Sequence, residues 1–244
     1  MMKTFAQSLV LLSLLAVMIF FSACKQEPAF IEQDRIYTSY ELYYNGNTEK
    51  TYARAVFKIG GASGTLLKLG ENSSIGFIKV NPISDPDPLH YINEYGYYEK
   101  EYTTRWLKGR FYFTDENDNQ YENEITVHVA AFPETIDTIV KGNRWKLSWE
   151  GIYNIEKTAL GENESISFSL KEEYEGDIHT FYQHEEGAES IDLEGDETAA
   201  LPEGEYILSL ERRYQPELVQ KTGAGGTITG RFRPADRGVV VVEE

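Results

Sequence analysis

The chain has 244 residues, a formal net charge of −17 at pH 7 and an aromatic fraction of 13%, including 17 tyrosines. The acidic balance argues against nucleic-acid binding, because contacts with phosphates require neutralisation by lysine and arginine. The aromatic fraction is too high for a disordered stalk, so we expect a folded protein with one large or two modest cores.

The first residues have the three parts of a secretory signal. Lys3 supplies a positive charge, residues 9–21 form an apolar run of 13 residues, and the small residues Ser22 and Ala23 follow. A helix that spans a bilayer needs about 20 apolar residues, so a permanent transmembrane anchor is the weaker interpretation. We therefore expect residues 1–23 to be removed as a signal peptide.

The segment Phe21-Ser22-Ala23-Cys24 contains the single cysteine of the chain. It resembles the lipobox of bacterial lipoproteins, which implies that Cys24 is acylated and becomes the mature N-terminus. The alternative is a free or disulfide-bonded thiol, but an intramolecular disulfide requires a second cysteine. We expect a covalent lipid such as palmitate on Cys24 and no other cofactor.

The same resemblance indicates a location in the cell envelope. Lys25 follows the cysteine, whereas an aspartate there would retain such a lipoprotein in the inner membrane, so the outer membrane is favoured. One of the 23 basic residues lies in the signal, so the mature chain carries 22 basic and 40 acidic residues, a formal charge of −18. Anionic headgroups would not attract such a chain, and we expect membrane attachment through the lipid, with residues 24–35 as a tether.

The remaining sequence has the alternation of β-strands. In residues 52–59, Ala53, Ala55, Phe57 and Ile59 fall on one face, and residues 125–129 and 166–170 alternate in the same way. Strict alternation is typical of strands with one buried face. Turn signals rich in glycine, asparagine and aspartate separate these segments. An all-β chain of antiparallel strands is predicted.

An internal repeat suggests a tandem arrangement. Residues 60–77 and 151–168 are identical at eight of 18 positions with an offset of 91. A second pair of motifs, residues 107–113 and 201–208, lies about 95 residues apart. In the second copy Tyr206 follows a Gly-Glu turn, as in the tyrosine corner of immunoglobulin-like sandwiches, where the hydroxyl bonds to upstream backbone.

These observations predict two tandem antiparallel immunoglobulin-like β-sandwiches, comprising residues 36–130 and residues 131–244, with a hinge near Pro133. With the lipobox and the repeat, the chain resembles two-domain envelope lipoproteins of the Bacteroidota type. That resemblance implies no particular activity.

Several polar groups were considered as sites of chemistry. Residues 115–119 carry oxygens that could bind Ca²⁺, but they lack the glycine and glutamate spacing of an EF-hand loop, so a solvated hairpin turn is the favoured interpretation. Residues 172–197 hold eleven acids, of which two could act on a glycosidic bond if they faced each other in a cleft. His179 and His184 lack the spacing of a zinc site, and the glycines of residues 223–230 read as a hairpin turn. We predict no metal site and no enzyme activity.

The aromatic side chains of residues 91–106 are the candidate ligand site. Their flat apolar faces with polar rims suit stacking on sugars or packing against a protein. The alternative is that Tyr98, Tyr102, Thr104 and Trp106, which would share a strand face, line the first core, while residues 95–97 fill a loop. The residues selected are Tyr95, Tyr97, Tyr98, Tyr102 and Trp106.

The predicted function is that of a non-enzymatic, lipid-anchored envelope lipoprotein that acts as a binding or spacing module. One alternative is a glycan-binding protein that uses the aromatic segment of residues 91–106. Another is an accessory subunit of an envelope complex, with residues 239–242 as an exposed apolar strand edge. The predicted partners are therefore the membrane and an envelope protein or glycan.

Overall fold

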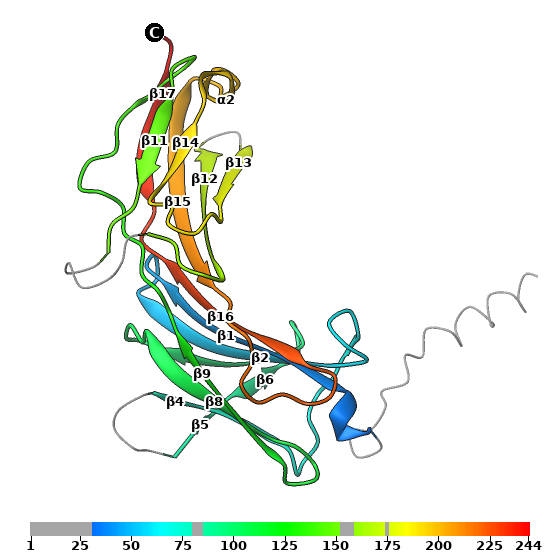
Figure 1. Cartoon of the computed structure of the whole chain (residues 1–244). Coiled ribbons are helices and arrows are strands. Elements are labelled where there is room, and N and C mark those ends of the chain that lie inside the picture. Colours follow the sequence, from blue (N-terminus) through cyan, green and yellow to red (C-terminus); the bar gives the residue numbers. More distant parts are fainter. Residues whose placement is uncertain (1–30, 80–84, 152–158, 174–175) are drawn as a thin grey trace, which may run out of the picture. The chain divides into compact units, whose positions relative to one another are not determined.

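The structure is a computed structural model, and it describes residues 31–79, 85–151, 159–173 and 176–244 (Figure 1). The signal segment, Cys24 and the tether up to residue 30 lie outside the described residues. Residues 32–244 form one compact unit. This unit is almost entirely β-structure, which confirms the predicted fold class.

The first strands form two facing sheets. One is built from β6, β7, β2 and β1, continued by the late strand β16 (Gly226–Arg233), and the other has the order β5-β4-β8-β9. A short 3₁₀ turn, η2 (Gln33–Arg35), precedes them. The strands are β1 (Ile36–Asn45), β2 (Lys50–Ile59), β3 (Thr65–Leu66), β4 (Ser74–Lys79), β5 (Asp87–Pro88), β6 (His90–Ile92), β7 (Tyr97–Tyr102), β8 (Lys108–Thr114) and β9 (Gln120–Thr126).

Alternation of apolar residues places aromatic rings between these two sheets. The ring of Tyr40 in β1 stacks on Phe111 in β8 with centroids 5.0 Å apart, and Phe57 in β2 lies 4.7 Å from Phe113. All four rings are at most 1% exposed. Burial of rings of this size dominates the energetics of a small core, so the pair of sheets is a β-sandwich.

The later strands form a second pair of facing layers. One layer has the order β13-β12-β15-β17-β10, and the other is the pair β11-β14. The elements are β10 (Ile139–Val140), β11 (Trp145–Ser148), β12 (Glu164–Glu172), β13 (Ile178–Gln183), β14 (Ser190–Leu193), α2 (Gly195–Ala199), β15 (Gly204–Tyr214), β16 (Gly226–Arg233) and β17 (Arg237–Val242).

A continuous apolar core fills the space between these layers. Trp145 in β11 meets Phe168 in β12 edge to face, with centroids 5.7 Å apart, and Leu147 and Leu208 are buried in the same cluster. The two-layer arrangement, with β12 beside β15 and β15 beside β17, corresponds to the C, F and G strands of an immunoglobulin-like sandwich.

The internal repeat occupies equivalent places in the two strand sets. Residues 69–77 lead into β4, which pairs with β8, and residues 160–168 lead into β12, which pairs with β15. Phe77 lies opposite Phe111. Its counterpart 91 residues later, Phe168, lies opposite Leu210, 99 residues after Phe111. The sequence offset between the two copies is therefore 91 residues from β4 to β12 and 99 residues from β8 to β15, whereas the second pair of motifs predicted about 95.

The predicted tyrosine corner is confirmed. The hydroxyl of Tyr206 donates to the carbonyl oxygen of Pro202 at 3.0 Å and lies 3.2 Å from a carboxylate oxygen of Glu172. Tyr206 is 2% exposed. The hydroxyl thus ties the start of β15 to the turn that precedes it.

Replacing Tyr206 with Phe is expected to lower the free energy of unfolding by about 1–2 kcal/mol, because the hydrogen bond to the Pro202 carbonyl oxygen is lost and the buried Glu172 carboxylate loses a donor. Urea denaturation followed by circular dichroism measures the change. The control is Tyr182→Phe, since Tyr182 is 72% exposed and its hydroxyl has no comparable role; this variant should change stability by less than about 0.5 kcal/mol. Equal effects of the two variants would contradict a structural role of the corner.

Strand β16 departs from the expected organisation. The sequence boundaries place residues 226–233 with the second sandwich, but β16 pairs in parallel with β1 from Thr38↔Gly226 to Asn45↔Arg233. At its other edge β16 pairs with β15 from Arg212↔Phe232 to Tyr214↔Gly230. The glycine-rich residues therefore do not form a hairpin turn as a whole, because those from Gly226 onward belong to this strand. Alternation has the same period in either sheet, so it does not indicate the partner.

Two further expectations concern local structure. The short helix α2 was not predicted, because five residues cannot carry an amphipathic stripe; a capping box between Glu194 and Glu197 stabilises it. Residues 239–242 were expected to be an exposed edge. Instead β17 lies between β15 and β10, with Val239 and Val241 buried. The accessory-subunit hypothesis therefore loses its main support.

Candidate functional site

The five aromatic residues selected from the sequence do not form one patch. Tyr98 and Tyr102 are 8% and 7% exposed and point into the first core. Tyr98 packs edge to face on Phe57, and its hydroxyl accepts the Leu69 N–H at 2.7 Å. Burial raises the pKa of both tyrosine hydroxyls above the ordinary value. These two rings are core residues, as the alternative interpretation expected from their shared strand face.

Tyr95 and Tyr97 lie on the opposite side of the sheet from this core. Their rings stack with centroids 5.5 Å apart, and Tyr95 is 59% exposed. Trp106 is half-buried elsewhere, and its ring lies 5.1 Å from the Lys79 ammonium, which also lies 4.8 Å from the Tyr102 ring. The stacked pair Tyr95 and Tyr97 is therefore the part of the predicted site that combines ring stacking with a largely exposed tyrosine.

Tyr97 belongs to an arginine–tyrosine ladder that crosses β16, β1, β2 and β7. The Arg231 guanidinium lies 4.6 Å from the Tyr43 ring, and the Arg54 guanidinium lies 4.9 Å from Tyr52 and 5.5 Å from Tyr97. Such cation–π contacts contribute about 0.5–2 kcal/mol each. The ladder (Tyr43, Tyr52, Arg54, Tyr97 and Arg231) orders the outer face of this sheet.

The charges of the ladder are compensated within the sheet. Arg54 pairs with Glu99 at 2.6 Å and with Glu41 at 3.3 Å. Arg231 pairs with Glu211 at 2.6 Å and with Glu41 at 2.8 Å. Although burial opposes their charge, these carboxylates raise the pKa of both arginines. With both cations paired, the ladder stabilises the sheet rather than offering an anion site.

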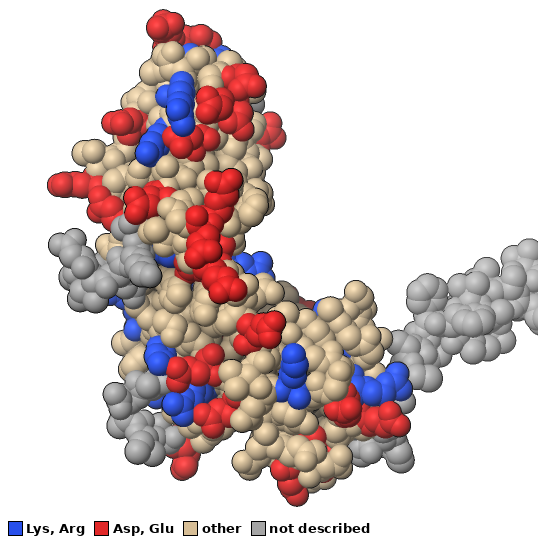
Figure 2. Space-filling model, viewed as in Figure 1, with Lys and Arg blue, Asp and Glu red and all other residues tan. Residues whose placement is uncertain are grey.

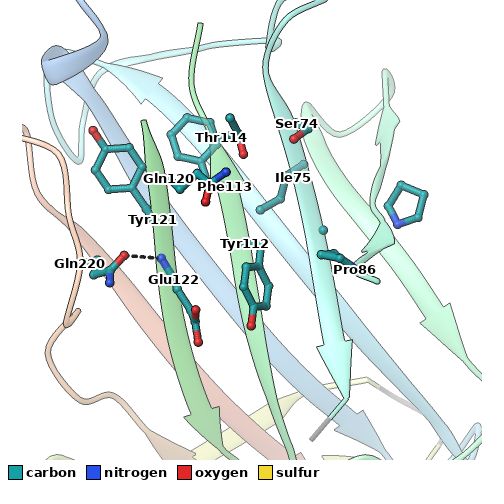
Figure 3. Close-up of a pocket in the computed structure, with 12 residues that line it drawn as sticks. Ser74, Ile75, Pro86, Tyr112, Phe113, Thr114, Gln120, Tyr121, Glu122 and Gln220 are labelled. Carbon is teal, nitrogen blue, oxygen red and sulfur yellow. Dashed lines mark hydrogen bonds between the residues drawn. The ribbon is translucent and has the colours of Figure 1, made fainter. Parts of the chain in front are cut away.

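A groove lies on the outer face of the β5-β4-β8-β9 sheet (Figure 3). Its volume is about 560 Å³, within the range of about 300–1,000 Å³ that is usual for small-molecule sites. Aromatic, proline, amide, hydroxyl and carboxylate groups share the lining. The lining residues are Ser74, Ile75, Gly76, Pro86, Pro88, Tyr112, Phe113, Thr114, Gln120, Tyr121, Glu122 and Gln220.

Strand register explains how these residues come together. Gly76 lies directly opposite Pro88 on one side and Tyr112 on the other, and Tyr112 lies opposite Glu122. Residues that are directly opposite in antiparallel strands share a face, so these four form one row across the sheet. A β-carbon at Gly76 would lie 2.6 Å from that of Pro86. The close approach of Pro86 therefore requires glycine and leaves a floor of backbone beside the Tyr112 ring.

Polar groups lie on the far side of the tyrosine. The backbone N–H of Glu122 donates to the Gln220 side-chain oxygen at 2.7 Å, which brings the 215–225 connection to the groove (Figure 3). The Glu122 carboxylate pairs with Arg110 at 2.9 Å, and both side chains are 41% exposed. The groove thus offers one ring face, exposed prolines and hydrogen-bonding groups. Sequence patterns did not single out this groove, although Tyr112 alternates with Phe111 and Phe113 and could have been assigned to the opposite, outward face on that ground.

The groups considered for metal binding are placed apart. Asp115 is fully buried and accepts the N–H groups of Asn117 and Asn119 at 2.8 and 2.9 Å, so its carboxylate closes the hairpin turn. His179 lies in β13 and His184 just after it. Within the part of the chain that the structure describes, no three histidine, cysteine or acidic side chains gather as a metal site would require.

The acids of residues 172–197 are distributed over strand ends, turns and α2, and most of those described are exposed. Glu172 is an exception, because it is buried beside the Tyr206 hydroxyl. None of them lines the groove. Figure 2 shows acidic side chains spread along the visible face. The facing carboxylate pair that glycoside hydrolysis would require is not found in this groove, whose lining carries one carboxylate, Glu122.

A buried polar cluster lies where β12 begins and the paired strand β15 ends. The Arg212 guanidinium pairs with Glu164 at 2.6 Å and donates to the carbonyl oxygens of Val129 and Ala159 at 3.0 Å. His128, whose side chain is 37% exposed, hydrogen-bonds Glu164 and stacks on Tyr214 with centroids 4.4 Å apart. Burial opposes ionisation, but hydrogen bonds from His128, Arg212 and the Gly161 N–H lower the pKa of Glu164 to about 2. The cluster is a structural joint rather than a ligand site.

No helix among the described residues is long and apolar enough to cross a membrane. Comparison with protein-family models and with the curated proteins gave no match.

Solved structures with a similar course of the chain include a cytokine receptor complex, with 10% identity, coverage of 83% of this chain and 94% of that one, and a TM-score of 0.30. The FN1–FN3 domains of chicken CNTN1 are 9% identical to this chain; the match covers 81% of this chain and 65% of that one, with a TM-score of 0.24. A tetra-tandem repeat from the extending region of a large adhesion protein is 11% identical; the match covers 80% of this chain and 49% of that one, with a TM-score of 0.22. The β-sandwich assignment rests on the strand pairing described above.

Proposed function

We propose that the chain is a non-enzymatic lipoprotein of the cell envelope, anchored through acyl chains on Cys24, whose folded part binds a ligand in the groove. The signal-like residues 1–23 and the single cysteine directly after them support the anchor. One acyl chain binds membranes only reversibly, so stable attachment requires more than one chain. The compact unit begins at Glu32, which leaves a short spacer after the anchor.

Blocking lipoprotein signal peptidase with globomycin should prevent removal of residues 1–23. The expected result is a precursor larger by this segment on denaturing gels, and incorporation of labelled palmitate that Cys24→Ser abolishes. The Cys24→Ser chain should also move from the membrane fraction to the soluble fraction if it is processed at all. Normal maturation in the presence of globomycin would refute acylation of Cys24.

The groove carries the binding role, and its chemistry favours a neutral carbohydrate. The Tyr112 ring offers a flat apolar face for the C–H surface of a sugar ring, while its hydroxyl and the exposed Pro86 and Pro88 complete a half-apolar rim. Gln120 and Glu122 can exchange hydrogen bonds with sugar hydroxyls. Small-molecule sites combine apolar walls with a few polar groups in this manner.

Charge argues against an anionic ligand. The described groove lining contains no lysine or arginine, and the adjacent Arg110 already pairs with Glu122 and Glu124 at 2.9 Å. The chain as a whole is strongly acidic. An anionic sugar would meet one carboxylate and no free cation in the groove, so we assign it to uncharged oligosaccharides.

The proposed site predicts that Tyr112→Ala weakens binding by at least about tenfold, because the stacking face is removed. The purified folded part would be applied to an array of neutral and uronic-acid oligosaccharides, and the affinity for the best neutral probe measured by calorimetry. The matched control is Tyr95→Ala, since Tyr95 is the exposed tyrosine of the original candidate segment and lies outside the groove.

The two variants separate the two glycan sites. Loss of affinity in Tyr112→Ala, with Tyr95→Ala within about twofold of the parent, supports the groove. The reverse result would transfer the site to the stacked pair Tyr95 and Tyr97. Absence of binding to every neutral probe would contradict the carbohydrate assignment, whereas the globomycin result tests the anchor independently.

A further inference from the structure

Strand β13 is an open edge of the large sheet. It pairs with β12 from Lys171↔Ile178 to Ile166↔Gln183, and no other described strand pairs with it. An unpaired edge presents a row of N–H and C=O groups to which another extended chain can bond. Six residues of regular strand are long enough to pair with such a segment.

Antiparallel geometry identifies the groups that face outward. The N–H of Glu172 donates to the carbonyl oxygen of Asp177 at 3.0 Å, so the odd-numbered residues of this segment direct their backbone groups toward β12. Ile178, Thr180 and Tyr182 therefore direct theirs away from the sheet. None of these three residues has a backbone hydrogen bond to a loop or side chain of the described chain.

Other strands of comparable length show how this chain closes an edge. Along β9, the side chain of Asn123 accepts the N–H groups of Val219 and Gln220 at 3.0 Å, and its amide donates to the Gln220 carbonyl at 2.8 Å. The segment that follows β15 thus covers β9. Strand β13 has no such cover among the described residues, and it contains no lysine, proline or bulge of the kind that blocks pairing.

Side chains on the same edge suit a protein partner. Ile178 and Tyr182 are 61% and 72% exposed, and Thr180 lies between them. Across β12, Lys171 lies opposite both Ile178 and Ile207, and Ile207 is 37% exposed. Exposed apolar side chains in line with an open edge offer contacts for alternate residues of an added strand.

The charges at the ends of β13 indicate which charge an added partner strand should carry. Glu173 and Asp177 lie at its beginning, and Glu185 and Glu186 follow its end. All four are exposed, and none forms an ion pair with a described residue. Two copies of this chain would place like charges together, so the edge selects against self-pairing and for a cationic segment.

We propose that β13 is a strand-addition site for a basic, extended segment of a partner protein. The added strand bonds to the backbone of Ile178, Thr180 and Tyr182, and lysine or arginine side chains of the partner meet the acidic ends. This site is distinct from the carbohydrate groove. It gives the lipoprotein a second, protein-binding surface.

The decisive variant is Thr180→Pro. Proline removes an N–H that points away from the sheet and blocks the approach of another strand, a substitution that edge strands tolerate. Thr180→Ala keeps the N–H and is the matched control. The probe is a fluorescent twelve-residue peptide of alternating lysine and valine, with a glutamate–valine peptide as the charge control. Binding is measured by anisotropy, and hydrogen exchange is measured at residues 178, 180 and 182.

We expect the lysine–valine peptide to bind, to slow exchange at those three amides, and to bind at least about tenfold more tightly than the glutamate–valine peptide. Thr180→Pro should weaken binding at least about tenfold and Thr180→Ala by less than about twofold. If Thr180→Pro does not fold, Tyr182→Lys, which places a charge of the same sign as the peptide's lysines at an exposed position and keeps every amide, should weaken binding about threefold or more.

Three results would overturn the proposal. One is equal binding by Thr180→Pro and Thr180→Ala, and another is binding without slowed exchange at the three amides, which indicates attraction by charge alone. The third is a dimer in sedimentation equilibrium that Thr180→Pro abolishes, which assigns the edge to a second copy. Tyr112→Ala should leave peptide binding unchanged, so failure of the groove and failure of this edge are distinguishable.

Discussion

Replacing Arg212 with Ala is expected to lower the free energy of unfolding by about 3–5 kcal/mol. Arg212 and Glu164 form an ion pair whose side chains are 3% and 2% exposed. Removing one partner of a buried pair leaves the other charge without compensation, and this accounts for the large expected loss. Urea denaturation at pH 7, followed by tryptophan fluorescence, measures the change.

The loss should be large also because Arg212 joins separate segments. Its guanidinium donates to the carbonyl oxygens of the buried Val129 and the partly buried Ala159, and each of these acceptors would lose a donor. Val129 follows the last strand of the first set, whereas Arg212 lies in β15 of the second. The variant is therefore expected to destabilise the boundary between the two strand sets in particular.

Arg110→Ala is the matched control. Arg110 also pairs with glutamates at 2.9 Å, but its side chain is 41% exposed, and such pairs contribute about 0–1 kcal/mol. The comparison holds the residue type constant and changes its burial. Similar losses for Arg212→Ala and Arg110→Ala would contradict the assigned role of the buried pair.

The stability of the protein should fall by about 3 kcal/mol between pH 5 and pH 2 through Glu164 alone. Its pKa is lowered from 4.5 to about 2 in the folded chain, because the hydrogen bonds from His128, Arg212 and Gly161 outweigh the burial that would raise it. A folded-state pKa below the unfolded one stabilises the protein above the unfolded value, and this stabilisation disappears as the pH falls to the folded value. One pKa unit corresponds to about 1.4 kcal/mol.

Comparison with Glu164→Gln isolates this contribution from those of the other carboxylates. The difference in free energy of unfolding between the parent and this variant should shrink by about 3 kcal/mol from pH 5 to pH 2. The control is Glu124→Gln. Lys108 and Arg110 lower the pKa of Glu124 too, but its side chain is 37% exposed, so solvent reduces the effect to less than about 1 kcal/mol. A constant difference for Glu164→Gln across this range would refute the assignment.

Local patterns predicted much of the fold correctly. Alternation along residues 52–59 and 166–170 matches β2 and β12, with Phe57 and Phe168 fully buried. The tyrosine corner was found because Gly-Glu-Tyr is a short motif whose partner, Pro202, lies four residues upstream. Features that depend on near neighbours in the chain can be read from the sequence.

Pairing between distant segments could not be predicted in this way. Strand β16 lies beside β1, more than 180 residues away, and nothing in its alternation distinguishes that partner from β15. Likewise, β17 has the apolar alternation of an edge strand or an interior one, and only its neighbours β10 and β15 decide between them. An alternating pattern specifies a buried face but not the strand that lies beside it.

The aromatic residues predicted as one site, in residues 91–106, lie on different faces for the same reason. Tyr98 and Tyr97 are adjacent in sequence but point to opposite faces of β7, one into the core and one into the arginine–tyrosine ladder. The groove combines Gly76, Tyr112 and Glu122 from three strands, so its row of side chains exists only once the register is set. Aromatic composition alone selected residues 91–106, whereas the groove is lined mainly by residues of β4, β8 and β9.

The sequence by itself determined the all-β class and the internal repeat, because alternation and local identity depend on residues that lie close together along the chain. The lipid anchor at Cys24 likewise depends on the sequence alone, and it stays a prediction. Only the tertiary structure decided which strands are edges, which tyrosines are exposed and which charges are buried. Those properties depend on long-range pairing, where the contacting groups are far apart in sequence and the local pattern is compatible with more than one partner. The open edge of β13 and the buried pair of Arg212 and Glu164 are both of this kind.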